Sequence, residues 1–189
     1  ETDYEWYVKT HADFLPRSRL ITQRFVDKYP KFKMLPADCS HTQLVAEGVD
    51  FCLTVFGTIA YEYAAMGIPT ITASQNCPTI AYDFNYHPRT VQEYRKVLLS
   101  LETFELPIDR QKVYEWYFMT YIYNRNDWLF GDYDSVMMAV GGYDEQFTPK
   151  MYRYWMKHVW DEAHHKKIMD GLMCFVDSGN LRLDIRHLG

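Results

Sequence analysis

The stretch Val49-Asp-Phe-Cys-Leu-Thr-Val55, together with the residues after it, decides the fold. It is mostly apolar, as a strand buried on both faces should be. Gly57-Thr58 follows almost at once, and residues 59–67 then predict a helix that ends at a glycine. Ile68-Pro-Thr-Ile-Thr72 predicts the next strand, with its proline at the strand start, where no ladder donor is required. A strand, turn, helix and strand in this order are typical of a parallel sheet.

The same alternation continues upstream of this unit. Residues 6–11 predict a short strand, and a helix opens at Pro16 and ends near Tyr29-Pro30. Residues 32–35 predict a second strand, and Ser40 is the expected N-cap of a short helix.

Downstream, a loop over residues 73–88 leads to a helix over residues 90–101, which Thr90 caps with Glu93 three residues later. The whole pattern predicts an α/β fold, with a Rossmann-like parallel sheet flanked by helices. Ligands bind to such sheets outside the carboxyl ends of the strands.

The chain changes character at residue 109. Residues 109–130 predict an aromatic helix, residues 131–149 are rich in turn formers, and residues 150–172 predict one further helix. The tail from Asp177 has weak strand character. We therefore expect a Rossmann-like domain over residues 1–108 and an aromatic-rich helical extension over residues 109–189.

Composition excludes several classes of protein. Hydrophobic residues make up 48% of the 189 residues, which excludes a disordered chain, and the net charge of −5 argues against a nucleic-acid binder that works by bulk charge. No run of apolar residues is long enough to span a membrane. The four cysteines, which form no C-x-x-C pair, predict buried thiols in a reducing, cytoplasmic compartment: Cys39, Cys52, Cys77 and Cys174.

The strongest candidate site lies at Gly57, Thr58 and Glu62. A glycine lets the backbone approach a ligand closely, and the start of a helix offers free N–H groups that suit a phosphate. The Thr58 hydroxyl is either a helix cap or a further donor. Glu62 lies one turn into the helix, where a carboxylate accepts hydrogen bonds from the vicinal hydroxyls of a ribose or sugar.

Further candidates follow from the rule on carboxyl ends. Lys9 and His11 end the first strand, and both side chains suit a diphosphate or phosphodiester. Ser74, Asn76 and His87 belong to the loop after the fourth strand, where contacts with a base or sugar compete with ordinary turn chemistry.

Two other patterns are interpreted as structural. Asp132-Tyr-Asp134 has the spelling of a metal-binding Asp-x-Asp motif, but we expect a solvated turn there. His158, Asp161, Glu162 and His165 share helical spacing, and we expect a solvated charged face rather than a metal site.

The run from Val8 to Leu101 resembles the C-terminal, donor-binding lobe of GT-B glycosyltransferases, of the type that makes bacterial capsule and surface polysaccharides. The likeness rests on Lys9-Thr-His11, Gly57-Thr58, Glu62 and Gly67-Ile-Pro69, in that order. The chain departs from that pattern at Ala12, where such enzymes commonly have proline.

The resemblance implies a role for each motif. The helix that begins at Thr58 would hold the phosphate of a nucleotide-sugar, Glu62 a hydroxyl of the sugar or ribose, and His11 the charge that develops on the leaving phosphate, without a metal or other cofactor. The acceptor would be a glycan or a lipid-linked molecule. A GT-B enzyme needs a second, N-terminal lobe, in the same or another chain, so this chain is expected to bind donor and not to turn over alone. The aromatic helix would then pack in the core or against that lobe, with peripheral membrane association as the alternative.

Two other functions stay open at this point. The first is half of a nucleotide-sugar epimerase, which would need a pair of acid–base groups close to the phosphate motif. The second is a non-catalytic interaction module that uses the aromatic helices to bind a partner. Binding of nucleotides separates the glycosyltransferase and the epimerase from the interaction module.

Overall fold

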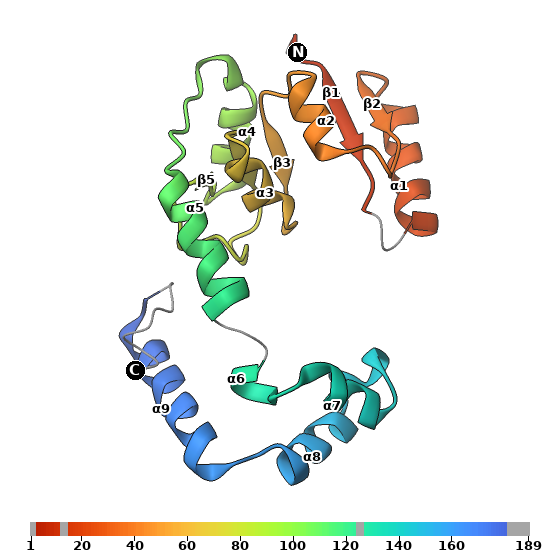
Figure 1. Ribbon diagram of the computed structural model, residues 1–189. Coiled ribbons are helices and arrows are strands. Elements are labelled where there is room, and N and C mark those ends of the chain that lie inside the picture. Colours follow the sequence, from red (N-terminus) through yellow and green to blue (C-terminus); the bar gives the residue numbers. More distant parts are fainter. Residues whose placement is uncertain (1–2, 12–14, 124–126, 181–189) are drawn as a thin grey trace. The chain divides into compact units, whose positions relative to one another are not determined.

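The computed structural model describes residues 3–11, 15–123 and 127–180, which form two compact units (Figure 1). The first unit runs to Gln75 and takes in residues 85–108, and the second takes in residues 76–84 and the chain from Asp109 onward. The chain therefore passes between the units three times.

The strands of the first unit form two small parallel sheets. β1 (Trp6–Lys9) pairs with β2 (Phe32–Leu35), and β3 (Cys52–Thr54) pairs with β4 (Thr70–Thr72), which in turn pairs with β5 (Asn85–Tyr86). The predicted class, an α/β fold with parallel strands and flanking helices, is confirmed. The expectation of a single sheet is not met in the described residues, and β5 lies in a segment that the sequence predicts as loop.

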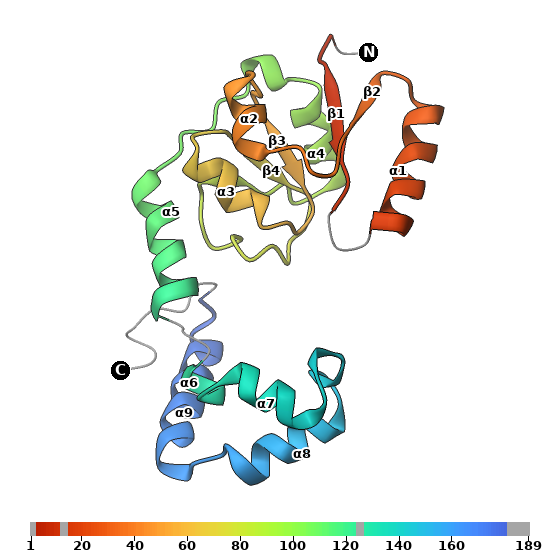
Figure 2. The same ribbon diagram turned by 45° about the vertical axis from the view of Figure 1, so that its right-hand side comes forward.

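Three helices connect these strands, α1 (Leu15–Lys28), α2 (His41–Ala46) and α3 (Ile59–Ala65), and α4 (Val91–Leu98) follows β5. The predicted caps at Ser40 and Thr90 are confirmed, because their side chains accept hydrogen bonds from the N–H groups of Gln43 and Glu93. The views in Figures 1 and 2 both place α1 beside β2.

The larger sheet has helices on both of its faces. Ile71, at the centre of β4, is fully buried in a cluster with Val97 of α4 and Leu101. Side chains alternate along a strand, so Cys52 and Thr70 point to the opposite face. On that face Cys52 lies close enough to Tyr63 of α3 for the two to interact electrostatically. Burial of both faces explains why these strands are mostly apolar in sequence.

The second unit is helical. It contains α5 (Arg110–Tyr117), a π-helical segment (Phe118–Tyr123), α6 (Asp127–Phe130), α7 (Tyr133–Val140), α8 (Pro149–His158) and α9 (Glu162–Ser178). The predicted single helix over residues 150–172 is thus wrong, since α8 and α9 divide it. The predicted helix over residues 109–130 changes from α- to π-helical at Phe118, and residues 124–126 lie outside the described part.

Capping residues account for the extra helix ends. The Asp132 carboxylate accepts a hydrogen bond from the Ser135 N–H and begins α7 inside the predicted turn region, and α7 ends at Gly141 with φ of +107°. The Asp161 carboxylate accepts from the His164 N–H and begins α9 three residues after α8 ends. The weak strand expected from Asp177 is wrong for residues 177 and 178, which belong to α9, and residues 181–189 lie outside the described part.

The segment 76–84 packs with α5 in the second unit. The Trp116 indole donates to the Pro78 carbonyl (3.3 Å), and Lys112 forms an ion pair with Asp83 (2.7 Å). The aromatic residues of α5 therefore serve in part as core packing, because Trp116 is buried together with Val113.

A separate cluster holds α7 and α8 together. Val136, Met137 and Val140 of α7 are buried against Met151 of α8, and Trp155 packs on the same cluster. The Trp155 indole also donates to the Leu129 carbonyl at 3.0 Å. These contacts fix which face of α8 is turned inward.

The four cysteines differ in their exposure. All four cysteines are free, but Cys174 is exposed and Cys39 is partly exposed, so the expectation of four buried thiols holds only for Cys52 and Cys77. Among the described residues, each helix is too short or too polar to cross a bilayer.

The core of the first unit can be tested by truncating Ile71. Ile71→Ala removes a fully buried side chain and should lower the free energy of unfolding by about 2–5 kcal/mol. The matched control is Ile21→Ala on α1, because Ile21 is 58% exposed and should change stability by less than about 0.5 kcal/mol. Urea denaturation followed by circular dichroism measures both values, and equal losses in the two variants would contradict the assigned core.

Candidate functional site

Most of the predicted site residues lie at the carboxyl ends of the parallel strands. Lys9 is the last residue of β1, and His11 is exposed two residues further on. Gly57 and Thr58 lie between β3 and α3, and Ser74 follows β4. This edge is where parallel α/β sheets bind their ligands.

Gly57 is required by a close contact with its own strand. The Thr54 hydroxyl accepts a hydrogen bond from the Gly57 N–H at 3.1 Å. A Cβ added to Gly57 would lie 2.8 Å from that hydroxyl oxygen, which is closer than such contacts allow. Packing against Thr54 therefore explains the glycine. The sequence alone had instead suggested the close approach of a ligand to the backbone.

Thr58 is exposed and its side chain makes no capping hydrogen bond. The N–H groups of Ala60, Tyr61 and Glu62 bond to carbonyls at the start of α3. Within the described part of the chain, the N–H groups of Thr58 and Ile59 donate to no protein acceptor. Two backbone donors are thus open to solvent at this turn, next to the Thr58 hydroxyl.

A second group of side chains centres on His41, the first residue of α2. Its Nδ1 atom lies 2.9 Å from the hydroxyl of Tyr63, and the two rings meet edge to face. Tyr63 is only 4% exposed, so it holds the imidazole from a fixed position in α3. The charges of Lys9 and Glu62 both act on His41. The contact between His41 and Tyr63 joins α2 to α3, and the charge of Lys9 acts on His41 from the end of β1.

The titration of these groups reflects burial first and charge second. Burial lowers the pKa of His41, Lys9 lowers it further, and the carboxylate of Glu62 acts in the opposite direction. Burial also raises the pKa of Tyr63 to about 12, with smaller contributions from Cys52, Cys39 and Glu62. Tyr63 therefore keeps its proton throughout the physiological range, and its hydroxyl stays a hydrogen-bonding partner of His41.

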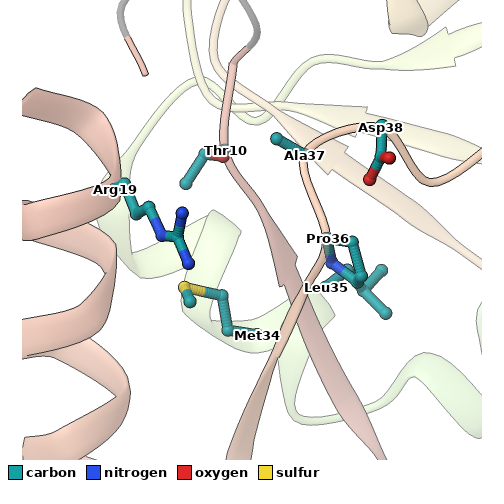
Figure 3. A pocket seen from close by; sticks show the side chains of 7 residues that line it. All are labelled: Thr10, Arg19, Met34, Leu35, Pro36, Ala37 and Asp38. Atoms are coloured by element: carbon teal, nitrogen blue, oxygen red, sulfur yellow. The ribbon is translucent and has the colours of Figure 1, made fainter. Parts of the chain in front are cut away.

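A pocket of about 580 Å³ lies at the carboxyl ends of β1 and β2 (Figure 3). Its lining residues come from β1, β2, the loop after β2 and α1: Thr10, Arg19, Met34, Leu35, Pro36, Ala37 and Asp38. Arg19 reaches into it from α1, and Thr10 and Asp38 add further polar groups. The volume falls within the roughly 300–1,000 Å³ typical of small-molecule sites.

The loop after β4 is held by side-chain hydrogen bonds. The Thr72 hydroxyl pairs with Nδ1 of His87, and the Gln75 amide donates to the Pro88 carbonyl at 2.7 Å. His87 therefore has a structural role in this loop. Ser74 stays near the edge in the first unit, whereas Asn76 belongs to the second unit and is not grouped with the other candidates.

The patterns interpreted as structural differ in detail from what the sequence predicts. Asp132 and Asp134 are both exposed, as predicted, but they cap and begin the helix α7 instead of forming a turn, and Asp134 accepts from the Tyr143 hydroxyl. His165 is buried and stacks on Trp160, which corrects its assignment to a solvated face. No group of three or more metal-ligating side chains occurs among the residues that the structure describes.

Sequence reasoning missed His41, Arg19 and Asp38. His41 follows the cap residue Ser40 directly and thus opens a helix just after a strand, the same arrangement that made Thr58 a candidate. Arg19 and Asp38 lack such a signal, because their position at the pocket depends on how α1 lies beside β2.

The arrangement suits a ligand with both a negative charge and hydroxyl groups. Lys9 and the open N–H groups of Thr58 and Ile59 are donors for an anionic oxygen. The Glu62 carboxylate is an acceptor for hydroxyls. Comparison of the chain with protein-family models, curated proteins and solved structures gives no significant match. The function must therefore be argued from these residues.

The contact between Gly57 and Thr54 predicts coupled effects on stability. Gly57→Ala should lower the free energy of unfolding by about 1–3 kcal/mol, because the new Cβ meets the Thr54 hydroxyl. Thr54→Ala should cost about 1 kcal/mol through the lost hydrogen bond. Urea denaturation of the double variant should give a smaller loss than the sum of the single losses. Strict additivity would show that the two positions do not touch.

The environment of His41 predicts the sign of three pKa changes. By NMR, its imidazole should titrate below the ordinary value of 6.5. Lys9→Met should raise its pKa and Glu62→Gln should lower it, since each variant removes one charge that acts on the ring. Lys33→Met is the control, because Lys33 pairs with Glu5. A His41 midpoint that does not respond to Lys9 or Glu62 would rule out the cluster.

The same shift makes stability depend on pH. The folded chain binds a proton at His41 less readily than the unfolded chain does, so stability should fall as the pH drops below 6.5. His41→Gln, which retains a partner for Tyr63, should weaken this dependence.

Proposed function

We propose that the first unit binds the nucleotide-sugar donor of a glycosyltransferase that builds a surface polysaccharide or glycoconjugate. One arrangement carries the proposal: Lys9 ends β1, His41 begins α2 and Glu62 lies in the first turn of α3, and the charges of Lys9 and Glu62 both affect the pKa of His41. A helix cap or a single solvated ion pair does not need charged side chains from three different elements near one histidine. The resemblance of residues 8–101 to donor-binding lobes agrees with this function.

The phosphate is the first group to place. Lys9 supplies a positive charge, and the open N–H groups of Thr58 and Ile59 supply directed hydrogen bonds. His11 is exposed at the end of β1, within the same edge, and adds a second cationic group when it is protonated. Together these groups would stabilise the negative charge that grows on the leaving phosphate.

The sugar or ribose is the second group. Glu62 lies in the first turn of α3, four residues after Thr58, on the same side of the helix. When the phosphate of a nucleotide-sugar binds at Thr58, the hydroxyl groups of its sugar or ribose would therefore lie within reach of the Glu62 carboxylate. Ser74 follows β4 at this edge and is a further polar contact in the proposal.

The transfer step then has a simple balance. An acceptor hydroxyl forms a bond to the anomeric carbon, and the bond from that carbon to the phosphate oxygen breaks. The electron pair leaves with the nucleoside phosphate, and the acceptor proton passes to a base. In the proposal that base and the glycan or lipid-linked acceptor belong to a second lobe, so this chain alone binds donor without turnover.

Donor binding can be tested by calorimetry and by thermal unfolding. UDP, CMP and their sugar conjugates should be titrated, because a ligand that binds only the folded state raises the melting temperature. Glu62→Gln should weaken a sugar nucleotide about 10- to 100-fold, as expected when a charged hydrogen bond is lost. His11→Ala should weaken the phosphate contact and lower the affinity for both free and conjugated nucleotides.

Two controls make the result decisive. Glu102→Gln removes an exposed carboxylate elsewhere in the first unit and should leave affinity unchanged. Inorganic phosphate alone should bind more weakly than any nucleotide. If no nucleotide stabilises the folded chain, or if Glu62→Gln and His11→Ala bind as wild type does, the proposed function is wrong.

A further inference from the structure

The outward face of α8 is positively charged. The helix contains Lys150, Arg153 and Lys157 and no acidic residue, in a protein whose net charge is −5. Among the described residues, the one carboxylate paired with these cations is Glu145, which lies 3.8 Å from Lys150. Arg153 and Lys157 form no ion pair there. A local positive surface thus stands on a chain that is acidic overall.

The same face exposes large apolar side chains. Tyr152 is 54% exposed and Met156 is 57% exposed, and the two lie four residues apart on one side of α8. Phe147, two residues before the helix, is 79% exposed. A solvated helix face normally carries polar residues at such positions, so these apolar groups lack an explanation within the unit.

The orientation of α8 makes this face contiguous. Met151 is buried against α7 and Trp155 packs beside it, so the opposite side of the helix points to solvent. Tyr152, Arg153, Met156 and Lys157 line one shallow hollow of about 360 Å³. Two apolar side chains and two cations therefore share a single surface.

We propose that this face of α8 adsorbs to an anionic lipid surface. The lysine and arginine side chains would pair with lipid phosphates, and Tyr152 and Met156 would enter the boundary between headgroups and acyl chains. The positive charge of this face complements an anionic lipid surface, which gives a local attraction on a chain that is acidic overall. The inference is independent of donor binding in the first unit.

Vesicle co-sedimentation tests the proposal directly. The full chain should bind vesicles made of equal parts phosphatidylcholine and phosphatidylglycerol, should bind vesicles of phosphatidylcholine alone far more weakly, and should dissociate as salt is added. The double variant R153Q/K157Q should bind the anionic vesicles about 25-fold more weakly, since each cation near such a surface contributes about five-fold. Tyr152→Ser should weaken binding without changing its salt dependence.

The matched control changes the same net charge elsewhere. Arg95 and Lys96 are exposed in the last turn of α4, and R95Q/K96Q should bind as wild type does. Circular dichroism checks that each variant is folded. Equal losses in the two double variants, equal binding to both kinds of vesicle, or binding to a single-stranded RNA but not to vesicles would each overturn the proposal.

Discussion

Parallel pairing of β3 with β4 is the constraint on which the first unit depends. Their register places Cys52 opposite Thr70 and Thr54 opposite Thr72, so both strands end level with each other. The segments that follow β3 and β4 therefore begin at the same edge of the sheet. Polar residues that are far apart in sequence come to lie at this edge. The apolar middle of β4 secures the arrangement, because Ile71 is fully buried beneath α4.

Hydroxyl groups then hold the segments that leave the edge. Thr54 binds the Gly57 N–H, Thr72 pairs with His87, and Tyr63 fixes the His41 ring. Each of these bonds joins a residue within a strand or helix to a residue in a turn or at a helix start. These bonds fix the turns and helix starts that carry the candidate residues, as a preorganised site requires.

The sequence predicts the parts that local chemistry determines. The order of strands and helices up to β4, and the helix capped by Thr90, follow from hydrophobic runs and caps, whereas the two-residue strand β5 lies in a segment predicted as loop; the positions of Lys9, Gly57 and Ser74 at strand ends follow from that order. Contacts across the fold have no such local signal. Nothing in the sequence marks Tyr63 as the partner of His41. Asp132 and Asp161 cannot be singled out as helix caps, because several neighbouring residues are equally polar. The aromatic pattern of residues 109–130 also cannot show where α5 gives way to a π-helical segment.

Residues 76–84 belong to the second unit although residues of the first unit precede and follow them, so no single position in the sequence separates the two units. A truncation after Ile108 would leave this peptide behind without α5, so that Trp116 no longer meets Pro78 and Lys112 no longer meets Asp83. A fragment that ends before α5 therefore contains only a small part of the second unit, because residues 76–84 belong to that unit.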